Sequence, residues 1–225
     1  MSRTAGPDAE RLTLTGVKDW LAANASEAER QKLLGYGIPN DRALGVSMGQ
    51  MLALARKRPK DPELAAALWA DGGYEMRTLA LLLDDPGTLT RARMDAMVAG
   101  FDNWAICDTA CFRLFDKAPR AWDAVPQWAA SERLYTRRAA FALVWGLSVH
   151  DKQAGDQRFL EALTLAEAHA SDARPHVAKA ISMAVRATGK RNTTLRAAAL
   201  NWADCVEPRG KTEARLAREV RRALG

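Results

Sequence analysis

The spacing of apolar residues constrains the fold of this 225-residue chain more than any other feature. Apolar side chains recur three and four positions apart through segments of roughly 9–18 residues, as they do on one face of an α-helix. Short breaks rich in glycine, proline or aspartate separate these segments and supply helix caps and stops. No stretch shows the alternation of apolar and polar residues that a half-buried strand requires. The sequence therefore predicts an all-α protein of about a dozen helices.

The expected helices recur in pairs about every 35–40 residues, a period typical of HEAT and armadillo repeats. We therefore expect an α-solenoid of about six helical pairs with a concave basic face. A compact helical bundle is the competing architecture. Residues 1–9 are expected to form a disordered lead, and residues 10–225 a single HEAT-like helical-repeat domain. The predicted helix boundaries include 41–57, 90–100, 119–130, 132–149 (capped by Ser131) and 159–170.

The net charge of +6 is concentrated near the C-terminal end of the sequence. From Arg174 onward there are 12 lysines and arginines and 4 acidic residues, so residues 1–173 carry a net charge of −2. A basic third on a near-neutral body favours a polyanionic partner such as nucleic acid. Arginine-rich amphipathic helices also carry solvated positive faces that bind no partner. Charge alone leaves both interpretations open.

Cysteine and histidine are too few and too scattered for a metal or redox site. The three cysteines, Cys107, Cys111 and Cys205, fit no zinc or redox spacing, and the three histidines lie far apart in the sequence. We therefore expect no metal and no cofactor. No apolar run approaches the roughly 20 residues that span a bilayer, and residues 1–8 lack the apolar core of a secretory signal. We expect a cytoplasmic protein that binds no membrane, with a monomer as the default.

The stretch 101–112 contains the strongest candidate site. Asp102 or Asn103 can cap a helix that starts there, because a short side-chain oxygen can accept the N–H groups of the first turn. Trp104 and Asp108 then stand four residues apart on one helix face. An aromatic ring beside a carboxylate suits a cationic ligand. The same spacing is also common where the tryptophan belongs to the core and the aspartate ends a polar stripe, so spacing alone leaves both open.

Five short motifs follow one another between about Leu33 and Leu200. They are Leu34-Gly35-Tyr36-Gly37-Ile38-Pro39; Leu68-Trp69-Ala70 with Tyr74-Glu75-Met76-Arg77-Thr78-Leu79-Ala80; Asp102-Asn103-Trp104-Ala105-Ile106-Cys107-Asp108; Arg137-Arg138-Ala139-Ala140-Phe141; and Lys179-Ala180-Ile181-Ser182-Met183-Ala184-Val185-Arg186. In this order they resemble the motifs of the DNA alkylation repair family, whose HEAT-like members are DNA glycosylases. The resemblance implies a helical-repeat fold that cradles duplex DNA.

What the resemblance implies is excision of positively charged alkylated purines, such as 3-methyladenine and 7-methylguanine, from duplex DNA. Such a monofunctional glycosylase would hydrolyse the N-glycosidic bond without a deep base-flipping pocket. Asp108 would stabilise the developing oxocarbenium ion and orient water, and Trp104 would contact the deoxyribose or the lesion through its ring. Arg138, or its neighbour Arg137, would hold a phosphate near the lesion.

Further DNA contacts, and one departure, follow from the same resemblance. Four basic residues would contact the DNA backbone without reading its sequence: Lys179, Arg186, Lys190 and Arg191. Tyr36 is a candidate for a role on the protein surface. The family usually has a second tryptophan where this chain has Met183, which can pack against a sugar but lacks a flat aromatic face. Trp145 or Trp202 would have to compensate. The departure keeps a second hypothesis open, a non-catalytic HEAT-like DNA-binding protein or protein-interaction scaffold.

Overall fold

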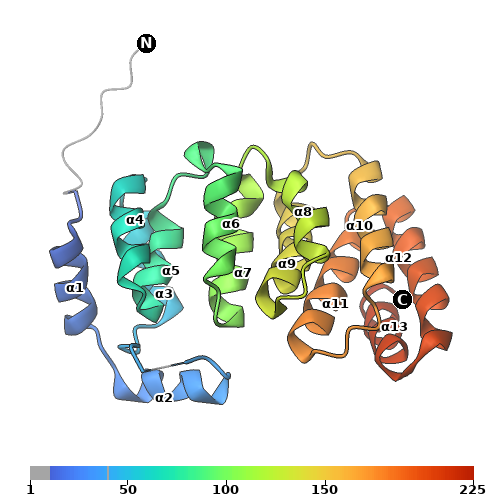
Figure 1. Ribbon diagram of the computed structural model, residues 1–225, viewed down its shortest axis with the longest axis horizontal. Coiled ribbons are helices and arrows are strands. Elements are labelled where there is room, and N and C mark those ends of the chain that lie inside the picture. The colour runs from blue at the N-terminus through green and yellow to red at the C-terminus, as the bar shows by residue number, and fades with distance from the viewer. Residues whose placement is uncertain (1–10, 40) are drawn as a thin grey trace, which may run out of the picture. The chain divides into compact units, whose positions relative to one another are not determined.

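The computed structural model describes residues 11–39 and 41–225, and the chain divides into two compact units, one ending at Asp85 and one beginning at Pro86. Thirteen α-helices and three short 3-10 segments occur in the described part, which contains no strand (Figure 1). The all-α prediction is confirmed. The expected disordered lead lies outside the described residues, and a single domain over residues 10–225 stays a prediction. None of the described helices has the length and apolar character needed to cross a membrane.

The first unit contains five helices, and four of them, α1, α3, α4 and α5, pack around one apolar core. Leu21, Met51, Leu68 and Leu79 lie at its centre and are fully buried. Each of the first four helices follows a residue whose side chain accepts a backbone N–H of the first turn, because the helix itself leaves those donors unpaired. The helices are α1 (Leu14–Ala23), α2 (Glu27–Gly35), α3 (Met48–Arg56), α4 (Pro62–Asp71) and α5 (Tyr74–Leu83).

The helix predicted over residues 41–57 is wrong at its start, because α3 begins only at Met48, after a Ser47 cap. The backbone before it cannot be helical at Gly45, whose φ is 78°. A Cβ at Gly45 would also lie only 2.0 Å from the Ser26 carbonyl oxygen, so the position requires glycine.

Glu75 fixes this same loop from inside the first unit. Its carboxylate is 1% exposed and accepts the backbone N–H groups of residues 44–46 at 2.8–3.2 Å. Three donors compensate the cost of burying the charge. Glu75 belongs to one of the family-like motifs, and its contacts show that it holds a loop in place.

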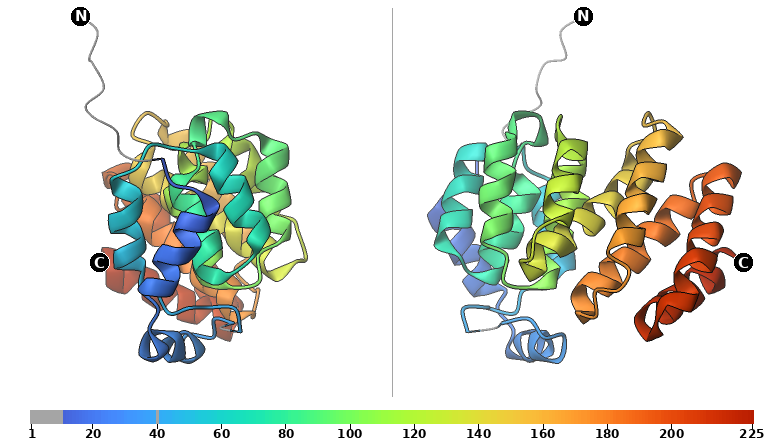
Figure 2. Two further views of the ribbon diagram at one scale, coloured as in Figure 1. Left: turned by 90° about the vertical axis from the view of Figure 1, so that its left-hand side faces the viewer. Right: turned by 45° about the vertical axis from the view of Figure 1, so that its right-hand side comes forward.

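The second unit contains eight α-helices, seven of which stack in two layers. α7, α9, α11 and α13 pack in succession in one layer, and α8, α10 and α12 pack in succession in the other (Figure 2). α9, α11 and α13 each also pack against a sequence neighbour in the other layer, which is the pairing expected of helical repeats. The elements are η1 (Pro86–Thr88), α6 (Arg91–Ala99), α7 (Trp104–Arg113), η2 (Phe115–Lys117), α8 (Ala121–Ala129), α9 (Leu134–His150), α10 (Asp156–Ala168), α11 (Pro175–Gly189), α12 (Thr193–Val206), η3 (Glu207–Arg209) and α13 (Lys211–Leu224).

α9 is the central helix of the second unit, with 17 residues and contacts to α7, α8 and α11. Residues 139–144 are buried on every side, as expected for a helix that is apolar all round. The helix begins at Leu134, not at residue 132, because the Ser131 hydroxyl accepts the N–H of Arg133 in a turn before the helix. α10 begins three residues earlier than predicted. The first turn of α10 is polar, so the apolar periodicity used for the prediction begins only after it.

Candidate functional site

α7 begins at Trp104 because Asn103 caps it. The Asn103 side-chain oxygen accepts the N–H of Ile106 at 2.9 Å, and the side chain is buried in this role. The cap sets the phase of the helix, so Trp104 and Asp108 share a face, and both are partly buried. The helix start predicted from the sequence is confirmed.

The Asp108 carboxylate is held from the neighbouring helix by Arg138. The Arg138 Nε and Nη2 donate to Asp108 Oδ1 and Oδ2 at 2.9 and 2.7 Å, a bidentate pair. The third nitrogen of Arg138, Nη1, donates to the carbonyl oxygen of His176 at 2.6 Å, in the first turn of α11. One guanidinium therefore joins α7, α9 and α11. The Arg138 side chain is 3% exposed and that of Asp108 15% exposed, so the carboxylate still reaches solvent.

Two further side chains border this pair. The rings of Tyr135 and His176 lie 5.8 Å apart, on α9 and α11. Burial and the Arg138 charge lower the pKa of His176, with Asp108 opposing them, so the imidazole is neutral near pH 7. We call the set Trp104, Asp108, Tyr135, Arg138 and His176 the carboxylate cluster.

Burial also raises the pKa of the Asp108 carboxyl above its ordinary value, because the hydrogen bonds and charge of Arg138 offset only part of the desolvation cost. An ionised carboxylate offers about four lone-pair positions, and the two hydrogen bonds from Arg138 occupy two of them. Asp108 can therefore still accept a hydrogen bond from a water or a ligand on its exposed side.

Arg137 turns away from the cluster, and all its nitrogens are engaged inside the protein. Nε donates to the Ala129 carbonyl oxygen at 3.0 Å, and Nη1 and Nη2 donate to Asp172 and Glu132, each at 2.8 Å. Burial raises the pKa of Asp172, but hydrogen bonds from Arg174 and Arg137 outweigh this and lower it to about 2. These contacts argue against Arg137 as a phosphate ligand and give it a structural role between α9 and the start of α11.

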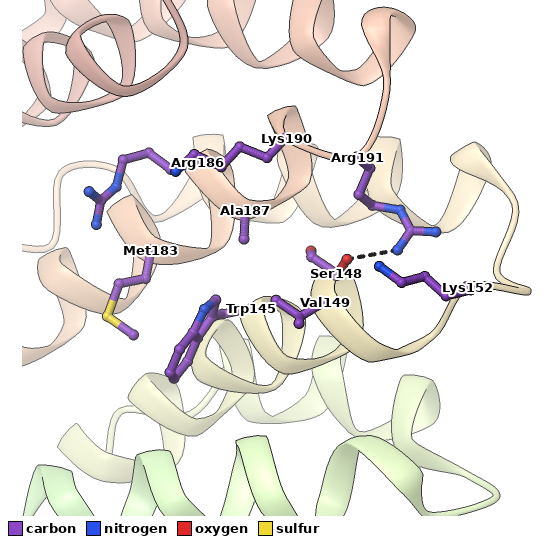
Figure 3. Close-up of a pocket in the computed structure, with 9 residues that line it drawn as sticks. All are labelled: Trp145, Ser148, Val149, Lys152, Met183, Arg186, Ala187, Lys190 and Arg191. Carbon is purple, nitrogen blue, oxygen red and sulfur yellow. Dashed lines mark hydrogen bonds between the residues drawn. The ribbon is translucent and has the colours of Figure 1, made fainter.

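A hollow of about 710 Å³ lies between α9 and α11 (Figure 3). Its lining includes four basic residues and no acidic one. Met183 and Trp145 face each other across one end of it, and Phe112 of α7 stacks on the Trp145 ring at a centroid distance of 4.2 Å. We call this the basic hollow; its lining residues are Trp145, Ser148, Val149, Lys152, Met183, Arg186, Ala187, Lys190 and Arg191.

The basic residues proposed from the sequence differ in their surroundings. Arg191 donates to the carbonyl oxygens of Ser148 and Ala154 and lies 4.0 Å from the centre of the Phe159 ring. Because these contacts engage its guanidinium, Arg191 adds positive charge to the hollow but few N–H groups that a ligand could bind. Lys190 is exposed on the rim. Lys179 is also exposed but does not line the hollow.

The carboxylate cluster and the basic hollow use the same helices two turns apart. Trp145 follows Arg138 by seven residues on α9, and Met183 follows His176 by seven on α11. Seven residues of helix bring side chains back to nearly the same face about 10 Å further along. Phe112 follows Asp108 by four residues on α7 and stacks on Trp145 of the basic hollow, so it links the two regions.

Gly146 sets the distance between α7 and α9 beside Trp145. A Cβ at this position would lie 2.8 Å from the Cys111 carbonyl oxygen and 3.1 Å from the Cβ of Asp116. The two backbones therefore approach as closely as glycine alone permits.

The sequence matches the family described as DNA alkylation repair enzyme over residues 17–223. The chain belongs to the DNA alkylation repair family. A solved structure superposes with a TM-score of 0.80 at 18% identity, covering 95% of this chain and 96% of that one. It is described as representing a new family of proteins related to the HEAT-like repeat DNA glycosylases with affinity for branched DNA structures. At that identity it shows the fold, which confirms the HEAT-like solenoid. No curated protein matches the chain.

For a member of the DNA alkylation repair family, the structure brings some of the predicted residues together and separates others. Asp108 and Arg138 touch, and Met183 faces Trp145 in the basic hollow. Trp202 is 3% exposed and does not line the hollow. Tyr36 is 62% exposed and belongs to the first unit.

Sequence inspection missed Tyr135 and His176 in the carboxylate cluster. The signal that was available is a spacing: seven residues separate His176 from Met183 and Arg138 from Trp145, which places each pair on one helix face. Within the described residues, no group of three or more His, Cys, Asp or Glu side chains is arranged to hold a metal ion.

Proposed function

We propose that this protein binds duplex DNA and excises cationic alkylated purines, such as 3-methyladenine and 7-methylguanine, with Asp108 beside the reacting sugar. The observation that carries the proposal is the Asp108 carboxylate, held by two hydrogen bonds from Arg138 and still partly exposed next to Trp104. Membership of a family of DNA alkylation repair enzymes supports the same chemistry.

The proposed reaction is hydrolysis of the N-glycosidic bond. The bond electrons move to the alkylated base, which already carries a positive charge and leaves neutral, so no general acid is required. The sugar becomes oxocarbenium-like, and water adds at its C1′ and releases one proton to the solvent. In this proposal Asp108 would accept a hydrogen bond from that water and stabilise the cation.

Arg138 acts through Asp108 in this scheme. It fixes the carboxylate in one orientation. This orientation contributes to the rate of hydrolysis because the attacking water must be aligned with C1′ of the sugar. It is a positioning residue. The sequence-based role of Arg138 as a phosphate ligand is less compatible with its contacts, because all three of its nitrogens donate inside the protein.

The backbone-binding role is best supported for two residues of the hollow, Arg186 and Lys190, and for the exposed Lys179. Trp104 would pack against the sugar or the lesion, as a ring beside a developing cation. We keep a cytoplasmic monomer as part of the proposal.

The test is base release from duplex DNA carrying 7-methylguanine or 3-methyladenine. Asp108→Asn keeps the side-chain size and should lower the rate about 100- to 1000-fold, because it removes the charge that stabilises the transition state. Duplex affinity should stay within about twofold. Glu161→Gln, on the exposed face of α10, is the matched control and should release base at the wild-type rate. Equal rates for Asp108→Asn and wild type, or no release by wild type, would overturn the proposal.

A second candidate is a DNA-binding protein that does not excise bases. Met183 in place of the family tryptophan favours it, as does the description of the matching structure, whose family has affinity for branched DNA. Binding of a three-way junction that weakens steeply with salt, together with no base release, would support this candidate. A protein-interaction scaffold would show no such affinity.

A further inference from the structure

The basic hollow has the size of a site for a small ligand. Its volume of about 710 Å³ falls in the range of about 300–1000 Å³ that is usual for ligand pockets. Trp145 on α9 and Met183 and Arg186 on α11 belong to long helices, so this part of the lining is held by rigid elements (Figure 3). Lys152 follows α9, and Lys190 and Arg191 follow α11.

The chemistry of the lining selects an anion. Lys152, Arg186, Lys190 and Arg191 line the hollow, and no aspartate or glutamate does. Arg186 donates its Nε to the Ser182 carbonyl oxygen of its own helix, at 3.1 Å. In the part of the chain that the structure describes, neither the Nη atoms of Arg186 nor the amines of Lys152 and Lys190 have an ion-pair partner. Glu219 on α13 is an acidic residue that interacts electrostatically with Arg186. Burial raises the pKa of Glu219, but a hydrogen bond from Ser182 and nearby positive charges lower it overall.

The same lining also selects a planar apolar group. Phe112 covers one face of the Trp145 ring and fixes its orientation, while the rest of the ring lines the hollow opposite Met183. A phosphate alone would make no use of this surface, and an uncharged aromatic compound would make no use of the cations. A nucleotide carries both groups within the dimensions of the hollow.

We propose that the basic hollow binds one unpaired nucleotide of DNA, with its base against Trp145 and Met183 and its phosphate on Arg186 and Lys190. A base inside a duplex has both faces covered by its neighbours, so only a base outside the stack can meet an aromatic side chain in this way. Unpaired nucleotides occur at junctions, single-stranded ends and gaps. The inference rests on the DNA binding in the proposed function but not on base excision.

The first experiment places the fluorescent base 2-aminopurine at the unpaired position of a three-way junction. Binding of wild type should quench it, because stacking on Trp145 brings the two rings into contact. Trp145→Leu should remove the quenching and lower the affinity for the junction about tenfold. The affinity for a duplex of the same length should change less than twofold. Trp145→Phe keeps a ring and should recover most of the affinity, which separates stacking from misfolding.

The second experiment removes charge. Arg186→Met/Lys190→Met should reduce the slope of log affinity against log salt for the junction by about two, because two phosphate contacts are lost. Arg218→Met is the matched control, because Arg218 is exposed on α13 and bonds the carbonyl oxygen four residues earlier, as Arg186 does. Its slope should change by one unit or less.

The outcomes separate this inference from the proposed function. If Trp145→Leu binds junction and duplex as wild type does, or Arg218→Met matches the double variant, the hollow is not a nucleotide site, whatever the base-release assay shows. If wild type releases no base but loses junction preference in Trp145→Leu, base excision fails and the nucleotide site stands.

Discussion

The carboxylate cluster and the basic hollow share helices α9 and α11, yet the arginines of the two regions have opposite surroundings. In the cluster, Arg138 is 3% exposed and all its nitrogens donate inside the protein. In the hollow, Arg186 gives one nitrogen to its own helix and faces an open volume with the rest. Two arginines of equal formal charge thus have different surroundings, and on this basis we propose that Arg138 positions an acid and Arg186 attracts a ligand. Burial and pairing, more than charge count, decide which arginine can meet DNA.

The largest effect expected from this difference concerns stability. Arg138→Met should lower the free energy of unfolding by about 3–5 kcal/mol, because it leaves the largely buried Asp108 carboxylate without its partner. Arg186→Met, the same substitution in the hollow, should change it by no more than about 0.5 kcal/mol. Urea unfolding measures both. Similar losses for the two variants would remove the distinction between closed cluster and open hollow.

A smaller effect is expected where the two regions are joined. Gly146→Ala should destabilise the protein by about 1–3 kcal/mol, because the new methyl group would lie 2.8 Å from the Cys111 carbonyl oxygen. Gly155→Ala is the control, since a Cβ there meets nothing within 4 Å. Thermal unfolding of the two variants gives the difference. A Gly146→Ala protein as stable as wild type would mean that α7 and α9 are not packed this closely.

The smallest effect is a pH dependence at Asp172, a carboxylate outside the cluster that pairs with Arg137 and Arg174. The pKa of Asp172 is lowered to about 2 from 3.8, so its ionised form stabilises the fold above pH 4 and this contribution is lost as pH falls toward 2. After allowance for solvent screening it amounts to about 1–2 kcal/mol. Asp172→Asn should therefore flatten the stability profile between pH 4 and pH 2. An unchanged profile in the variant would show that Arg137 and Arg174 do not stabilise the charge.

Local sequence signals were enough to predict the all-helical fold, a helix cap at Asp102 or Asn103, and the shared face of Trp104 and Asp108. These features depend on residues within one turn of each other. The sequence left open which of Arg137 and Arg138 would hold a phosphate, and it did not predict the pairing of Arg138 with Asp108. Neighbours on a helix point about 100° apart, and only the packing of other helices decides which one reaches Asp108.

The features that were missed depend on contacts distant in sequence. The start of α3 is set by Glu75, 30 residues away from Gly45, which no local pattern reveals. The basic hollow is a space between α9 and α11, and no local sequence pattern indicates a space between two helices. Trp145 was therefore named only as a possible substitute for the tryptophan replaced by Met183, with no contact to argue from.

Gly146 also bears on how this protein can diverge. With α7 and α9 in backbone contact, mutation has no easy way to widen or narrow the gap between Asp108 and the Trp145 ring, because any side chain at residue 146 collides with Cys111 or Asp116. Relatives with a different ligand are then expected to differ at side chains that face α9 from α11, such as Met183, while the helix spacing is inherited unchanged. Met183 is the position at which such selection would act first.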